Sequence, residues 1–296
     1  MWGASVNPGL LGLGTALSWG TGDFLARLSG RAVGPGRTLL VVFGISSLVL
    51  MPFALAPAQV ILDDLTLTGR AGAVAACGIF LLAGTWLLYL SLTRGPLSVA
   101  VPIVSSYPVP LMVYGFLVGG FVPTPAMWMA MAATLVGVWI VGRAGHKTQH
   151  KEGHVQGRIG ATIAICFATI AVFDVAIVLT GKLAADIGMP AALWSTRTVA
   201  FVALAGIFLV RRQSLGISAK WWGVLSVQGV IDLMGYVALF SAQTLGGTTT
   251  ASVASSAYGV VTILLARTIL KEVITLTQLA GMALVFAGVV AVTALS

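Results

Sequence analysis

Ten long apolar stretches constrain this chain more than any other feature of its sequence. A helix needs roughly 20 apolar residues to cross the hydrocarbon core of a bilayer, and ten stretches come close to that length: 10–28, 38–56, 71–92, 99–118, 125–142, 159–180, 190–210, 222–243, 250–269 and 275–295. The composition agrees, because 58% of the residues are hydrophobic, 8% are charged and the mean hydropathy is +1.02, outside the balance of a soluble globular chain. We therefore expect an all-α integral membrane protein with ten transmembrane helices.

The basic residues lie in short loops between the apolar stretches, which argues against a nucleic-acid-binding stripe despite the net charge of +8. Cytoplasmic loops of membrane proteins are enriched in Lys and Arg, so these residues act as topology signals. They predict both termini outside and a multi-pass protein of the cell inner (plasma) membrane. With that orientation the outer loops keep Arg70 and Lys182, and the inner loops hold Arg27, Arg31, Arg37, Arg94, Arg143, Lys147, Lys151, Arg158, Arg211, Arg212, Lys220, Arg267 and Lys271.

An internal repeat emerges when the chain is aligned with itself at an offset of 151 residues. We predict a first repeat in residues 1–145, a basic linker in 146–157 and a second repeat in 158–296. Because each repeat holds five spans, an odd number, the second enters the membrane in the opposite sense. Inverted repeats are typical of transporters with a binding site near the bilayer midplane, so we expect a central cavity. Identical pairs include Thr93 with Thr244, Gly95 with Gly246, Met131 with Met282 and Gly137 with Gly288.

The fourth stretch is unusual because residues 101–110 read VPIVSSYPVP. Each proline removes a backbone donor and bends a helix, so this stretch should face protein or a cavity instead of lipid. The repeat offset matches Pro108 with Gly259. We expect two related bending elements, with hinge positions at Pro102, Pro108, Pro110 and Gly259.

Few ionisable side chains fall inside the predicted spans, and we single out four of them, because a charge is costly there and marks a pathway or a paired neighbour. Asp23 and Asp174 are 151 residues apart, and burial favours the protonated form of a carboxyl group, so a proton-exchanging pair is one interpretation. A structural role is the other, with Asp23 paired to Arg27, and Asp174 or Asp232 paired to Arg197. The four residues are Asp23, Asp174, Arg197 and Asp232.

Aromatic residues form a second constellation, because all five tyrosines lie in the third, fourth, eighth and ninth spans, which are equivalent in the two repeats. Buried Tyr and Trp side chains need partners for their OH and NH groups, and a polar cavity supplies them. Such rings suit flat, amphipathic substrates, whereas helix packing is the alternative role of any single ring. The predicted substrate cavity comprises Trp19, Thr85, Trp86, Tyr89, Ser105, Ser106, Tyr107, Trp194, Gln228, Tyr236, Ser255, Ser256 and Tyr258.

Metal and redox chemistry is not expected. Cys77 and Cys166 lie singly inside apolar stretches, without a CxxC pair. Three histidines are spaced by four in the linker, where a glycine and the polarity of the segment favour a solvated loop over a metal-binding helix face: His146, His150 and His154. We predict no metal and no cofactor.

Two parts of the sequence carry recognisable motifs, WGTGDF at 19–24 and LLARTILKEVITLTQLAG at 264–281 with FAGV at 286–289. The first resembles the first helix, and the second resembles the end, of an EamA-type repeat of the drug/metabolite transporter superfamily. The first copy departs from the pattern, because FVP stands at 121–123 where an acidic residue is usual. Relatives also keep their termini in the cytoplasm, which conflicts with the charge distribution above.

The resemblance implies an exporter or facilitator of small metabolites, and the ten-helix plan is similar to that of bacterial aromatic amino-acid exporters. We therefore predict a monomeric secondary transporter, not an enzyme, that exports small organic metabolites by alternating access of its two repeats, with amino acids of aromatic preference as substrates. A proton-coupled exporter of drugs or other metabolites is one alternative. A polytopic enzyme acting on lipid-linked substrates is another, for which the loops offer only Asp63, Asp64 and the histidines.

Overall fold

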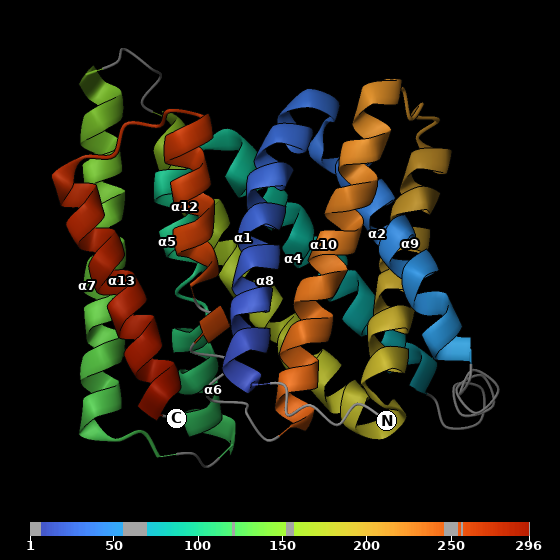
Figure 1. Cartoon of the computed structure of the whole chain (residues 1–296), viewed down its shortest axis with the longest axis horizontal. Coiled ribbons are helices and arrows are strands. Elements are labelled where there is room, and N and C mark those ends of the chain that lie inside the picture. The colour runs from blue at the N-terminus through green and yellow to red at the C-terminus, as the bar shows by residue number, and fades with distance from the viewer. Residues whose placement is uncertain are drawn as a thin grey trace.

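The structure is a computed structural model of the 296-residue chain, and it describes residues 7–55, 70–119, 122–151, 157–245, 254–255 and 257–295. Every regular element in these ranges is an α-helix, which confirms the predicted all-α class (Figure 1). The helices are α1 Pro8–Val33, α2 Pro35–Leu55, α4 Arg70–Arg94, α5 Leu97–Val104, α6 Pro108–Gly119, α7 Pro125–Lys151, α8 Gly157–Ile187, α9 Met189–Val210, α10 Ala219–Thr244, α12 Tyr258–Ile269 and α13 Leu276–Leu295.

These helices correspond to the ten predicted spans, with α5 and α6 together forming the fourth. Within the described residues, seven helical segments are long and apolar enough to cross a membrane, and α12 and α13 supply shorter apolar stretches at 258–269 and 276–292. Helix α1 has 26 residues but is more polar, because it carries Asp23, Arg27 and Arg31. Helix α7 runs to Lys151, so the start of the predicted linker is helical.

Several helix ends follow the capping chemistry of the sequence. Helix α1 has Pro8 in its first turn, where a missing N–H costs nothing, and the Asn7 side chain accepts a hydrogen bond from Gly9 N at 2.8 Å. At the start of α13 a capping box forms, since Gln278 N donates to Thr275 Oγ1 at 3.2 Å and Thr275 N donates to Gln278 Oε1 at 2.9 Å.

The proline-rich fourth span is broken into two helices. Helix α5 ends at Val104, residues 105–107 form a turn, and α6 begins at Pro108. The freed carbonyl groups find local partners, because Tyr107 N donates to Val104 O at 3.2 Å and Val109 N donates to Ser106 O at 3.0 Å. The break therefore leaves these groups satisfied inside the protein, as a non-helical segment at membrane depth requires.

The packing of the helices is symmetric under exchange of the two repeats. Helix α1 packs on α10 and α12, and its counterpart α8 packs in the same way on α4 and α5. Helix α4 packs on α9, and its counterpart α10 packs on α2. The remaining contacts join equivalent helices of the two repeats, α2 with α9 and α7 with α13. Helix α1 starts at the end of the molecule where α13 finishes, whereas α8 starts at the opposite end (Figure 1). The two repeats are thus inverted and interleaved, and their largest shared core draws on helices of both, from Phe24 on α1 to Val289 on α13.

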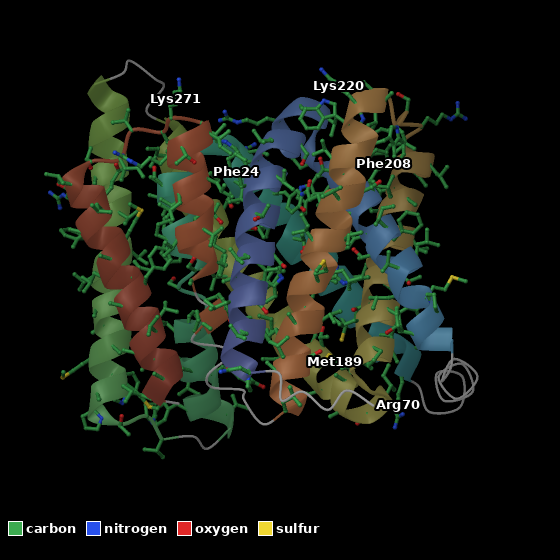
Figure 2. The ribbon with its side chains drawn as sticks, in the orientation of Figure 1. Phe24, Arg70, Met189, Phe208, Lys220 and Lys271 are labelled. Atoms are coloured by element: carbon green, nitrogen blue, oxygen red, sulfur yellow. The ribbon has the colours of Figure 1, made fainter. Side chains whose placement is uncertain are left out.

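The two ends of the bundle differ in charge. Lys220 and Lys271 lie at one end and Arg70 at the other (Figure 2), as the predicted grouping of basic loops requires. At the basic end Arg27 pairs with Glu272 at 3.6 Å and donates to the carbonyl of Leu92 at 2.6 Å and to that of Gly95.

The Glu272 carboxylate also accepts hydrogen bonds from Leu97 N at 3.1 Å and Ser98 N at 3.2 Å, at the amino end of α5, where the helix dipole favours an anion. These contacts tie α1 and α5 of the first repeat to the α12–α13 loop of the second. We call this network of Arg27, Glu272, Leu97 and Ser98 the basic-end latch.

Candidate functional site

A cavity of about 320 Å³ lies between the helices of both repeats. Its polar residues sit near the middle of long helices, with Asp23 on α1 and Asp232 on α10, each helix 26 residues long. This depth is where inverted-repeat transporters hold their substrates. The wall is formed by Trp19, Gly22, Asp23, Val42, Phe43, Leu81, Thr85, Leu88, Tyr89, Val104, Tyr107, Thr169, Phe173, Ile177, Arg197, Asp232, Tyr236, Leu239 and Tyr258.

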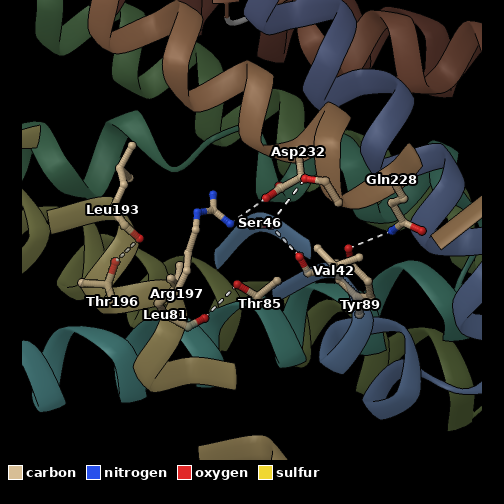
Figure 3. A network of polar contacts seen from close by, with 11 residues as sticks. Val42, Ser46, Leu81, Thr85, Tyr89, Leu193, Thr196, Arg197, Gln228 and Asp232 are labelled. Carbon is tan, nitrogen blue, oxygen red and sulfur yellow. Dashed lines mark hydrogen bonds and ion pairs between the residues drawn. The ribbon is translucent and has the colours of Figure 1, made fainter. Parts of the chain in front are cut away.

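The charged side chains of the cavity are two carboxylates and one guanidinium. Arg197 Nη1 donates to Asp232 Oδ2 at 2.9 Å (Figure 3), and the Arg197 guanidinium lies 4.6 Å from the centre of the Tyr236 ring. Asp23 makes no ion pair with any residue that the structure describes, yet it is close enough to Asp232 for the two charges to repel. The site therefore holds two carboxyl groups and a single guanidinium, so a cationic group of a substrate could pair with the carboxyl group that Arg197 does not hold.

Aromatic rings form an arc beside these charges. Trp19 meets Tyr236 edge to face with ring centres 5.0 Å apart, and meets Tyr258 in the same manner at 6.2 Å. Close approach of α10 to α1 depends on Gly235, because a methyl group there would collide with the Trp19 indole. Edge-to-face pairs of this kind are favourable and orient the rings, so the arc offers ordered apolar surface to a ligand.

A buried amide holds one of the tyrosines in place. Gln228 on α10 is fully buried and accepts a hydrogen bond from Ser29 Oγ at 2.9 Å. It donates a hydrogen bond to Tyr89 OH at 2.8 Å (Figure 3). These bonds connect α10 to α1 and to α4. Gln228 therefore supports the cavity from behind, although it does not line it.

The structure brings nine of the predicted site residues to the cavity wall. Thr85 is among them, with its hydroxyl bonded to Leu81 O at 2.8 Å on its own helix. The nine are Trp19, Asp23, Thr85, Tyr89, Tyr107, Arg197, Asp232, Tyr236 and Tyr258.

Other predicted cavity residues do not reach the wall. Trp86 is 38% exposed and packs over Gly36 on α2, and Trp194 packs against the apolar cluster around Leu50. Ser106 Oγ donates to Ile103 O at 2.7 Å. Buried side chains away from the wall also include Ser105, Ser255 and Asp174, and Ser256 lies outside the described residues.

The predicted hinge residues cluster where the two bending elements meet. Pro102 is buried inside α5, and Pro108 and Pro110 lie in the first turn of α6. Gly259 is the second residue of α12, and a methyl group there would come within 2.7 Å of Ser105 Oγ. The turn of the first repeat is thus in close contact with the start of α12 in the second.

Several wall residues were not predicted from the sequence, and they follow a simple spacing. On α8 the wall holds Thr169, Phe173 and Ile177, each four residues from the next. Residues four apart share a helix face, so extending from each polar anchor by one turn would have found Leu81 and Leu239 as well. Val42 and Phe43 on α2 carry no comparable signal.

Comparison with known proteins agrees with this architecture. Fifteen chains of solved structures match, among them one described only as "Crystal structure of protein", which is 18% identical, aligns over 96% of this chain and 95% of its own length, and gives a TM-score of 0.63. That likeness concerns the fold. No curated protein matches the sequence. A sequence profile of the EamA-like transporter family matches residues 8–143 and again residues 159–294. The chain therefore belongs to the EamA-like transporter family, as a multi-pass membrane transporter of small metabolites.

Proposed function

We propose that this transporter exports amino acids, with a preference for aromatic side chains, by alternating access of its inverted repeats. The observation that carries the proposal is the composition of the central cavity, which combines Asp23, Arg197 and Asp232 with an arc of aromatic rings. An amino acid presents an ammonium group, a carboxylate and a side chain, and the cavity has a complementary group for each.

The charges of the cavity support a zwitterionic substrate. Asp23 has no ion-pair partner in the described part of the chain and lies beside the Trp19–Tyr258 arc, so it is suited to an ammonium group, which also gains from nearby ring faces. Arg197 is the only cationic residue of the cavity wall as described, and a guanidinium suits a carboxylate. In this structure Arg197 donates a hydrogen bond to Asp232. A substrate carboxylate would therefore either bind Arg197 beside Asp232 or take the place of Asp232.

The size and lining of the cavity support an aromatic side chain. A volume of about 320 Å³ accommodates a molecule the size of tryptophan, and most of the wall is apolar or aromatic. Full burial of a large apolar side chain is worth about 1.5–3 kcal/mol. We therefore expect tryptophan, tyrosine and phenylalanine to compete about 10- to 100-fold better than glycine.

Proteoliposomes loaded with labelled tryptophan test the proposal, with protein-free vesicles as the blank. We expect saturable efflux that unlabelled phenylalanine and tyrosine inhibit and glutamate does not. Tyr107→Ala should reduce this flux, whereas Tyr114→Ala, which changes a 40% exposed residue of α6 away from the cavity wall, should not. The absence of saturable flux for every amino acid would refute the proposal.

A second candidate is export of organic cations. It is favoured by one observation, that Arg197 is already paired with Asp232 while Asp23 has no ion pair in the described part of the chain. Tryptamine keeps the ammonium group of tryptophan without its carboxylate, and indole-3-propionate keeps the carboxylate without the ammonium group. Tryptophan should be transported better than both; if tryptamine equals or exceeds tryptophan, the cation exporter is the correct assignment.

A further inference from the structure

Asp174 is a buried carboxyl group that the proposed substrate site does not use. It lies on α8 with 8% of its surface exposed and is not part of the cavity wall, although the preceding residue, Phe173, is. Neither carboxyl oxygen has a hydrogen-bond partner in the described ranges. An ionised carboxylate in such a place would be an uncompensated buried charge, and uptake of a proton is how proteins avoid that cost.

No counter-charge for Asp174 is available from the described side chains of the helices packed on α8, namely α4, α5, α6, α7 and α9. Arg197 on α9 is committed to Asp232. Tyr107, at the break between α5 and α6, is close enough to interact electrostatically with Asp174 but is neutral. The other described ionisable side chains of these helices and of α8 are Arg70, Cys77, Tyr89, Arg94, Tyr114, Arg143, Cys166, Lys182 and Asp186, and no salt bridge joins any of them to Asp174.

The position of Asp174 links it to the cavity wall and to the turn that divides the fourth span. Its neighbour Phe173 and its electrostatic contact Tyr107 both line the cavity. Tyr107 also belongs to the turn that divides the fourth span. A change of charge at Asp174 therefore acts on the hinge and on the cavity wall without requiring the substrate to touch it.

We propose that Asp174 carries the proton that couples transport to a proton gradient, at a site separate from the substrate cavity. The inference rests on the proposed transport function and adds its energy source. A hydronium ion on one side of the membrane gives a proton to a carboxylate oxygen of Asp174, so that one of the ion's O–H bonds breaks and leaves water, and an O–H bond forms on Asp174. After the change of access the same bond breaks and water on the other side takes the proton, with no electron transfer.

A proton fits this site better than a metal ion. Sodium and larger ions need several oxygen ligands arranged around them, whereas among the residues described there is no group of three or more His, Cys, Asp or Glu side chains that could hold a metal ion. A single carboxyl group suffices for a proton.

Proteoliposomes with a trapped pH-sensitive dye test the proposal on the full-length protein. Addition of a transported amino acid should move protons in wild type and in Asp186→Asn, which removes an exposed carboxylate of the same helix. In Asp174→Asn we expect proton movement per substrate to fall at least tenfold, while exchange of labelled for unlabelled substrate and substrate affinity change less than about threefold. Asp174→Glu should restore proton movement.

The outcomes separate this inference from the proposed function. Absence of any amino-acid flux in wild type refutes the proposed function and the inference with it. Amino-acid flux in wild type without proton movement, or with dependence on sodium, refutes only the inference, and this measurement needs no variant. Proton movement that survives in a folded Asp174→Asn variant overturns it as well.

Discussion

Asp23 and Asp174 occupy equivalent positions in the two repeats, 151 residues apart, yet their surroundings differ. Asp23 lines the cavity together with Asp232 and the aromatic arc. Asp174 is buried behind the wall, with no hydrogen-bond partner in the described part of the structure. The two repeats therefore share a carboxyl group at the equivalent position, but its surroundings differ. We assign Asp23 to substrate binding and Asp174 to proton coupling.

The residue before each aspartate differs as well. Gly22 precedes Asp23, and the space beside it is open, with no atom within 4 Å of an added methyl group. Phe173 precedes Asp174, and its ring fills the equivalent place on the wall against Gly84 of α4. The glycine leaves its part of the wall open to a ligand, whereas the phenylalanine occupies the equivalent part.

Exchanging this residue gives the largest expected effect. Gly22→Phe copies the second repeat into the first and fills the space in front of Asp23, so substrate binding should fall on the order of 100-fold or more, because both the volume and the charge contact are lost. Gly14→Phe on the same helix, where the space is also open but the cavity is absent, serves as the control. Calorimetry in nanodiscs measures substrate binding to both variants. Equal affinities would contradict the claim that the open space at Gly22 admits the substrate.

Asp23→Asn removes the charge without changing the shape. A hydrogen bond to a charged group contributes about 1.5–3 kcal/mol, so affinity for tryptophan should fall about 10- to 100-fold, while Asp174→Asn leaves affinity nearly unchanged. Competition binding with the two variants side by side checks this. Equal losses in both would show that the two carboxyl groups have the same role.

Trp19→Ile tests whether the aromatic arc contributes to substrate binding. The variant copies the second repeat, which has isoleucine at the equivalent position 170. The variant loses the edge-to-face contacts with Tyr236 and Tyr258, each worth about 0.5–1.5 kcal/mol. We expect about a 5- to 20-fold loss of affinity for tryptophan and a smaller loss for leucine. Trp139→Ile, at a 60% exposed site on α7, should bind tryptophan with the affinity of wild type. If Trp19→Ile also kept that affinity, the aromatic arc would not be part of the substrate site.

The two repeats also differ at the ends of the bundle. The basic-end latch joins Arg27 to Glu272, whereas the positions related by the repeat offset are Val178 and Phe121, which carry no charge. Phe121 lies outside the described residues. The second repeat thus supplies an acidic residue whose counterpart in the first repeat is absent. One end of the transporter has an ion pair between the repeats, and the repeat offset supplies no equivalent pair of charges at the other end.

Arg27→Gln should have the smallest effect on substrate affinity and a clear effect on closure of the basic end. Arg27 is buried and serves Glu272 and two carbonyl groups, so the melting temperature should fall by several degrees and a cysteine introduced at the cavity should become more reactive toward a reagent added at that end. Arg31→Gln is the control, because Arg31 makes an exposed contact with Thr93 O at 2.9 Å. Identical behaviour of both variants would mean that the latch does not hold this end closed.

The sequence predicted the spans well because membrane insertion imposes long apolar stretches, and it predicted helix ends where side chains cap them, as at Thr275 and Gln278. It also singled out Asp23, Arg197 and Asp232, since intramembrane charge is rare. It did not predict which face of a helix a ring occupies. Trp86 and Thr85 are adjacent, but only Thr85 lines the cavity, because lipid and protein faces are both apolar and leave little periodicity to follow.

The most direct test of the central claim is a structure of the protein in lipid nanodiscs with bound L-tryptophan. The account predicts the ligand in the central cavity, with its ammonium group within hydrogen-bond distance of Asp23, its carboxylate directed to Arg197 and its indole against Trp19, Tyr236 and Tyr258. Tryptophan bound at any other place, or bound in the cavity with its ammonium group at Asp174, would contradict it.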